Sequence, residues 1–358
     1  MPHGRRFSYD DANMTRSRII AWTGIAWLCC AALVHADSPR PEDLLQQQFE
    51  LQRLPSSNIW AVRLEIELRA HWAELPRHRE AIAMLDQGLT EQVQTTRRAW
   101  LQAERNEKTL RVAIAALEPS NRERARLEGQ LAIIRRGLTP PERLGDREDV
   151  RRLLIALAEQ RNALWLTAQA IRQKTPLLAE AYDQLAEQPE VAALLRKIGG
   201  SHRLGPARNY ADDLKRLEQV EQPFLTEWLP LFMSGSRLRF TALANESTPI
   251  TFTWTSSPEP SFITATQAES LGIEFDAKDD QEEIVLEKRT FRTRQGIIPR
   301  LRLGKYELRS VKVLILPPEA EFAGARLSPI ALAGYSAEAQ PNLLRLVMTP
   351  QVSSAAAP

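Results

Sequence analysis

The residues that could carry out chemistry are few, and the most suggestive group is the loop TSSPEPS at residues 255–261. The stretch before this loop alternates like a β-strand, and the stretch after it ends in Leu-Gly like a short helix. Reactive side chains are often displayed on loops held between such elements. The loop contains no Asp, His or Cys, and its only acid, Glu259, stands between two prolines. Because alcohol side chains are neutral and poor bases, an active site here would need Glu259 as its acid.

The histidines and cysteines do not form a catalytic or metal-binding pattern. Beyond residue 36 the chain has only His71, His78 and His202, and the first two are seven residues apart, which is not a metal-ligand spacing. Both cysteines, Cys29 and Cys30, lie within the first 36 residues. If this segment is removed, the remaining chain has no disulfide, no thiolate ligand and no cysteine nucleophile.

Three further patterns in the sequence do not indicate a metal-binding, phosphate-binding or nucleophilic site. The acidic run that contains Asp276, Asp279 and Asp280 lacks the glycine and the terminal glutamate of a calcium-binding loop. The stretch KIGGSHRLG lacks the Lys-Ser/Thr ending of a phosphate-binding loop. The SGS stretch at residues 234–236 has no histidine nearby in the sequence. The sequence therefore predicts no metal ion and no cofactor.

The N-terminus has the pattern of a secretory signal. A basic segment starting at Met14 precedes an apolar run from Ile19 to Val34, and Ala36 offers a small residue for cleavage. This predicts a signal at residues 1–36, in which residues 1–13 are an extension, and a periplasmic or otherwise exported protein. Whether Met1 or Met14 is the true start stays open. The alternative is an uncleaved inner-membrane anchor, although the apolar run is short for a membrane span.

The charge balance argues against nucleic acid as the main partner. The formal net charge is +2, and the first 36 residues account for all of it. The remainder is near neutral, with acids and bases interleaved, whereas binding to phosphates requires a basic surplus on one surface.

Residues 37–232 have the period of α-helices. Apolar residues recur every three or four positions, which predicts a bundle or coiled-coil hairpin of five to seven helices. We expect a helix to stop at Pro76, another helix to start or a kink to occur at Thr175–Pro176, a capping box from Ser120 to Glu123, and a helix cap at Asp146. The stripes comprise Ile82, Leu85, Leu89, Val93, Trp100, Ala103, Leu110, Ile114 and Leu117, then Val150, Leu154, Leu157, Leu164, Ala168 and Ile171. Glu107 and Arg161 interrupt them, so a long parallel dimer is not required.

Residues 233–349 have the period of β-strands. The stretches 237–244 and 250–254 alternate and are joined by a turn, which predicts a hairpin. A short helix should end at Gly272, and later strands should reverse direction at Gly304. Residues 350–358 are expected to be a disordered tail. The predicted fold class is therefore α+β and multidomain.

The order of elements in residues 237–348 resembles the retropepsin-like aspartic peptidases, in particular the small exported bacterial members. In that family a hairpin leads into an Asp-Thr-Gly loop and a short helix ending in Leu-Gly. A strand pair and a closing Leu-Leu-Gly element follow. The matching positions are Leu303, Gly304, Leu308 and Val311 in the strand pair, and Leu332, Ala333 and Gly334 in the closing element. The resemblance implies a mostly-β barrel with a peptide-binding groove.

The chain departs from this family at the catalytic motif. Thr255, Ser256 and Ser257 occupy the Asp-Thr-Gly positions. The family mechanism requires two carboxylates that share one proton, and two copies of Thr255 cannot replace them. Glu259 is an acid in the same loop but lies four residues beyond the expected position.

Three hypotheses remain. The first is an exported non-catalytic protein whose degenerate peptidase-like domain binds a peptide or protein, or forms a homodimer, while the helical domain is a scaffold. The second is an aspartic peptidase with an unusual acid such as Glu259. The third is a purely structural envelope protein.

Overall fold

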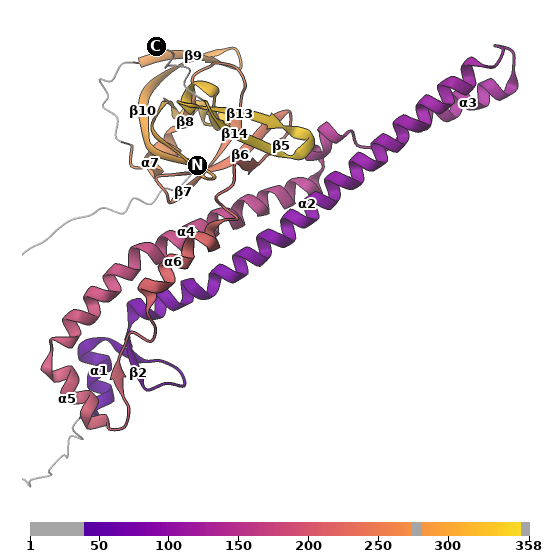
Figure 1. Ribbon diagram of the computed structural model, residues 1–358. Helices are drawn as coiled ribbons and strands as arrows, with labels where there is room; N and C mark the ends of the chain where they lie inside the picture. The colour runs from indigo at the N-terminus through magenta and orange to yellow at the C-terminus, as the bar shows by residue number, and fades with distance from the viewer. Residues whose placement is uncertain (1–38, 274–280, 352–358) are drawn as a thin grey trace, which may run out of the picture. The chain divides into compact units, whose positions relative to one another are not determined.

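The computed structural model describes residues 39–273 and 281–351, and it confirms an α+β architecture in which a helical region precedes a strand-rich region (Figure 1). The predicted signal, the acidic run at residues 276–280 and residues 352–358 of the predicted tail lie outside the described residues. None of the helices described is long and apolar enough to cross a membrane.

The helical region is built around two long helices that lie side by side (Figure 1). Leu154, Leu157 and Leu164 of the predicted stripe are buried, so the apolar period correctly located the packed surface. The described helices of this region are α1 (Pro41–Phe49), α2 (Arg63–Ala115), α3 (Arg122–Ile133), α4 (Glu148–Ala186), α5 (Pro189–Ile198) and α6 (Tyr210–Glu221).

The helix end predicted at Pro76 is absent, because Pro76 lies inside α2. No new helix starts at Thr175–Pro176, because Pro176 lies inside α4. Each proline directly follows a buried residue, Leu75 or Thr175, and packing of α2 against α4 outweighs the hydrogen bond that each proline removes. In α4 the Thr175 hydroxyl donates to the Ile171 carbonyl at 2.8 Å, which gives one backbone acceptor near the proline an additional donor.

The predicted helix caps are also wrong. Helix α3 is capped by Asn121, whose side chain accepts a hydrogen bond from the Glu123 amide at 2.8 Å, and not by a Ser120–Glu123 box. Asp146 belongs to a 3-10 turn, η1 (Pro141–Asp146), and forms an ion pair with Arg143 at 2.9 Å. Helix α4 therefore begins without a side-chain cap.

A small sheet interrupts the region that the sequence predicted to be helical. It has the order β1-β2-β3, where β1 is Leu51–Arg53, β2 is Ile59–Val62 and β3 is Arg203–Leu204. The parallel β2–β3 pair joins segments about 140 residues apart in sequence, and Trp60 is buried beneath it. Strands that pair across a long sequence separation leave no local pattern in the sequence, so this pairing could not be predicted from it.

The strand-rich region contains an eight-stranded sheet with the order β5-β6-β7-β12-β8-β11-β10-β9, and β6 also pairs with β10. A second sheet has the order β13-β14-β4. The predicted hairpin is confirmed as β6–β7, and Gly304 has φ +58° at the β10–β11 turn. The bounds are β4 (Trp228–Pro230), β5 (Phe232–Ser234), β6 (Arg237–Ala244), β7 (Thr248–Trp254), β8 (Phe262–Thr264), α7 (Ala265–Ser270), β9 (Gln281–Leu286), β10 (Arg289–Leu303), β11 (Tyr306–Leu316), η2 (Pro318–Ala323), β12 (Ala325–Leu327), η3 (Pro329–Leu332), β13 (Tyr335–Gln340), η4 (Pro341–Leu343) and β14 (Arg345–Pro350).

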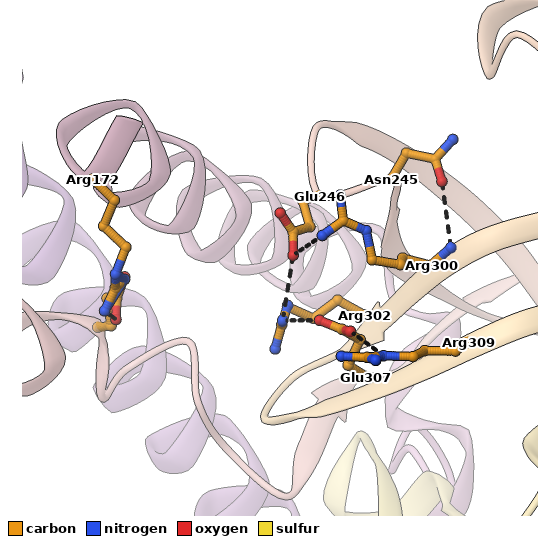
Figure 2. Close-up of polar contacts among 8 residues, drawn as sticks. Arg172, Asn245, Glu246, Arg300, Arg302, Glu307 and Arg309 are labelled. Carbon is orange, nitrogen blue, oxygen red and sulfur yellow. Dashed lines mark hydrogen bonds and ion pairs between the residues drawn. The ribbon is translucent and has the colours of Figure 1, made fainter. Parts of the chain in front are cut away.

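Charged side chains of the strand-rich region gather around Arg302 (Figure 2). Arg302 of β10 forms ion pairs with Glu307 and, at 3.8 Å, with Glu246, and its guanidinium lies 4.4 Å from the ring centre of Trp165 in α4. Burial lowers the pKa of Arg302, while the Glu307 and Glu246 carboxylates oppose that change. The strand-rich region is thus attached to α4 by a partly buried cation that two carboxylates neutralise.

Candidate functional site

The loop singled out by the sequence connects β7 with β8, and β12 pairs with both strands. Both ends of the loop are fixed to β12 and the residue after it. The Thr255 amide donates to the Leu327 carbonyl at 3.3 Å, and the Ser328 amide donates to the Ser261 hydroxyl at 3.0 Å. Within the loop, the Ser257 amide donates to the Thr255 hydroxyl at 3.2 Å. The Thr255 hydroxyl therefore supports the turn of its own loop.

The single acid of the loop is paired with a cation. Glu259 forms an ion pair with Arg326 of β12, and the Arg326 guanidinium also lies 4.5 Å from the ring centre of Phe262. About half of the Glu259 side chain is exposed. In this arrangement Glu259 is a poor candidate for the proton-sharing role of an aspartic peptidase acid.

A cavity of about 460 Å³, which we call the loop cavity, lies beside this loop. Thr255 and Glu259 line it on the loop side, and Val285 and Glu287 line it from the β9–β10 hairpin. The Glu287 carboxylate forms an ion pair with the Arg237 guanidinium at 3.1 Å. The cavity thus lies between a loop and a hairpin, with arginine-paired carboxylates on both sides.

Exposed apolar side chains border the loop cavity. Val285 is 70% exposed and Phe322 of η2 is 49% exposed, and both line the cavity. Strand β9 ends the order of the sheet, so one of its edges has no partner strand among residues 39–273 and 281–351. Such an edge presents unpaired amide and carbonyl groups to an incoming strand.

The other predicted site residues lie elsewhere. Leu332 is fully buried in the core of the strand-rich region. Gly334 has φ +87°, and its carbonyl accepts from the Gln351 amide at 2.8 Å. Neither residue lines the loop cavity, and Ser256 is exposed outside its lining. Of the predicted positions, the structure brings Thr255 and Glu259 together at one cavity.

The sequence did not identify the residues that complete this site. Arg326, Arg237 and Val285 lie up to 71 positions from Thr255. The pairing of β12 with β7 brings Arg326 to the cavity, the β6–β7 hairpin brings Arg237, and the β9–β10 hairpin brings Val285. The sequence shows the types of these residues, but no local sequence pattern indicates that they line one cavity.

The histidines make ordinary hydrogen bonds. His78 Nδ1 lies 2.9 Å from the Gln160 side-chain oxygen, His202 Nδ1 accepts from the Trp60 indole at 3.2 Å, and His71 lies 3.5 Å from Glu74. Within the part of the chain that the structure describes, no three His, Cys, Asp or Glu side chains gather as metal ligands would.

Comparison with known proteins gives limited information. No family model and no curated protein matches the chain. Among solved structures, the chain is similar to the crystal structure of a retropepsin-like aspartic protease from Rickettsia conorii, with 13% sequence identity and a TM-score of 0.27. The match covers 34% of this chain and 96% of that one.

Proposed function

We propose that this chain is an exported, non-catalytic binding protein whose retropepsin-like region holds an extended peptide segment of a partner protein, while the helical region is a scaffold. The observation that carries the proposal is the loop cavity beside the unpaired edge of β9, with Val285 and Phe322 exposed next to it. An extended peptide can add to a strand edge through main-chain hydrogen bonds while its side chains enter adjoining pockets.

The arginine pairing of the two cavity acids supports binding in preference to catalysis. Arg326 holds Glu259 and Arg237 holds Glu287, so each acid has a fixed cationic partner. Ion pairs at the rim of a groove fix register and partner choice more than affinity. The partner's identity stays open, and the expected chemistry is an extended segment with apolar side chains.

The binding proposal is tested with the full chain and a library of labelled peptides from unfolded proteins, by fluorescence anisotropy. Val285→Asp places a charge beside the cavity and should lower peptide affinity about tenfold, because a hydrophobic contact and an edge position are lost together. Ile297→Asp is the matched control, since Ile297 is a 51% exposed residue on β10 outside the cavity lining. Equal losses in both variants would contradict the proposal.

A second copy of the chain is a special case of the same binding. In that case the β9 edges would pair between two copies, and Val285→Asp would convert a dimer into a monomer. Light scattering over a concentration series distinguishes this outcome from capture of a different protein.

The competing hypothesis is an aspartic peptidase that uses Glu259. It predicts pepstatin-sensitive cleavage of an unfolded protein at acidic pH, lost in Glu259→Gln. Detection of such cleavage in the wild-type chain would replace the binding proposal. Absence of both cleavage and peptide binding would leave the purely structural hypothesis.

Export is tested separately. Cell fractionation and N-terminal sequencing of the mature protein should place it outside the cytoplasm with Asp37 as its first residue. An intact N-terminus in the membrane fraction would indicate the inner-membrane anchor instead.

A further inference from the structure

A second cavity, of about 650 Å³, lies among α2, α4 and the segment that leads into β4. We call it the Trp228 cavity. Apolar residues form much of its wall, namely Pro76, Ile82, Ala83, Leu157, Pro223 and Trp228. A smaller cavity of about 230 Å³ shares Asp86, Trp228 and Arg345 with it and continues along α2. The volume of the larger cavity is in the range of small-molecule sites.

Arg161 of α4 contributes a buried cation to this wall. The residue is 3% exposed, and its Nη2 donates to the carbonyls of Phe224 and Trp228, each at 3.2 Å. Its Nη1 is buried and has no hydrogen-bond partner among the described residues. A buried donor without an acceptor is costly, and the side chain that carries it lines the cavity. Arg161 is also the residue whose charge interrupts the apolar stripe of α4 in the sequence.

A second arginine faces the same tryptophan. The guanidinium of Arg345 lies 4.2 Å from the ring centre of Trp228, and that of Arg161 lies 4.6 Å from it. Cation–π contacts hold both groups in place without neutralising their charge. The rigid ring therefore positions two cations at the edge of one cavity.

Two partly buried arginines of the molecule provide a contrast. Arg172 and Arg302 have carboxylate partners in Glu221 and Glu307. Neither Arg161 nor Arg345 has a carboxylate within ion-pairing distance in the described part of the chain. Burial lowers the pKa of Arg161 to about 10, while the Asp86 carboxylate opposes the change, so the side chain stays cationic at neutral pH. A buried guanidinium without a paired carboxylate is unusual, and a ligand that carries a carboxylate would supply the missing negative charge.

We propose that the Trp228 cavity binds an organic carboxylate, in which a single carboxylate is joined to an apolar body. The carboxylate accepts from the guanidinium groups of Arg161 and Arg345, and the body packs against the apolar wall. Planar guanidinium groups match carboxylates in geometry and charge. Arg79, Glu80 and Asp86 also line the cavity, and the two carboxylates oppose a second negative charge on the ligand.

The probe for the test is octanoate, with octanamide, octylammonium and inorganic phosphate as comparison ligands, titrated into the full chain by calorimetry. Octanoate should bind with 1:1 stoichiometry and at least tenfold more tightly than octanamide, because only the carboxylate meets both charge and acceptor needs. Octylammonium and phosphate should show no binding at this site. Equal affinity for octanoate and octanamide, or no octanoate binding, would overturn the proposal.

Variants separate a ligand site from a structural role. Arg345→Gln should weaken octanoate binding about tenfold or more, because it removes a cation from the cavity edge. Asp86→Asn removes a repelling carboxylate and should strengthen binding severalfold, which a purely structural role of these residues would not produce. The matched control is Arg152→Gln, since Arg152 lies on α4 with 74% of its side chain exposed.

Arg161→Lys retains the charge but loses the planar fork and should weaken binding as Arg345→Gln does. If this variant does not fold, Arg345→Gln and Asp86→Asn decide the question. Unchanged octanoate affinity in both of those variants would place the bound ligand elsewhere and refute the proposal.

Discussion

Glu65 illustrates what a single buried residue does in this molecule. It is fully buried near the start of α2 and accepts hydrogen bonds from the Tyr182 hydroxyl, from the Tyr210 hydroxyl at 3.0 Å and from the Ala207 amide at 2.8 Å. Three donors satisfy a charge that would otherwise be prohibitive to bury. The cluster attaches α4, α6 and the loop after β3 to α2.

The same cluster predicts sensitivity to alkali. Burial, together with the Glu65 carboxylate, raises the pKa values of Tyr182 and Tyr210. Above about pH 10 the unfolded chain releases protons that the folded chain retains, so the free energy of unfolding falls as pH rises, by up to about 1.4 kcal/mol per pH unit for each tyrosine. Below pH 10 this contribution is fully present.

Urea unfolding between pH 9 and pH 11 measures this effect. Tyr210→Phe removes one of the two titrating groups and should reduce the fall in the free energy of unfolding between pH 9 and pH 11 by about 1.4 kcal/mol in all, because a tyrosine of the unfolded chain is half ionised near pH 10. An identical slope in the variant and the wild-type chain would contradict the assignment.

At the scale of elements, the long helices retain residues that disfavour helix. Gly88 lies inside α2, where an added Cβ would meet no atom within 4 Å. Gly304 is the opposite case, since it has a positive φ and an added Cβ would contact the backbone oxygen of Thr226. Packing of α2 against α4 sustains a 53-residue helix despite Gly88 and Pro76.

These two glycines predict changes of opposite sign. Gly88→Ala should raise the free energy of unfolding by about 0.5–1 kcal/mol, because alanine loses less backbone entropy in a helix. Gly304→Ala should lower it by about 1–3 kcal/mol through backbone strain and the clash at the β10–β11 turn. Urea denaturation of both variants measures the difference, and a stabilising Gly304→Ala would contradict the turn geometry.

At the scale of the whole molecule, the helical and strand-rich regions depend on shared contacts. Phe232, Leu243 and Leu344 from the strand-rich region belong to the same apolar cluster as Leu154 and Trp165 of α4. The Arg302 guanidinium of β10 adds a contact with the Trp165 ring of α4 to this joint, while Glu246 and Glu307 of the strand-rich region pair with that cation (Figure 2). We therefore expect changes at the joint to affect both regions together.

Arg302→Gln tests this expectation. Its side chain is 13% exposed, and its loss leaves the partly buried Glu307 without one cation and removes the contact with Trp165, which should cost about 2–4 kcal/mol. Arg309→Gln is the matched control because Arg309 pairs with the same Glu307 but is 81% exposed, so its loss should cost under about 1 kcal/mol. Calorimetric unfolding in which Arg302→Gln melts only one region would contradict a shared joint.

Local patterns in the sequence were sufficient to assign the type and order of most elements. The three-to-four-residue period located the α4 stripe, and the two-residue period located β6, β7 and their hairpin. The two-residue period of strands and the three-to-four-residue period of helices are properties of neighbouring residues. They can therefore be recognised in the sequence without knowledge of distant contacts. That the loop at residues 255–261 has Glu259 as its single acid is equally a matter of residue identity.

The packing and the ion pairs around these elements depend on contacts between segments that are distant in the sequence. Pro76 and Pro176 continue their helices because α2 and α4 pack against each other, which no local propensity reports. The pairing of Glu259 with Arg326 depends on β12 lying between β7 and β8. The two arginines at Trp228 come from segments more than 180 residues apart. Such contacts form when burial of the apolar core brings distant residues together. The pattern of neighbouring residues in the sequence does not identify which distant residues will meet.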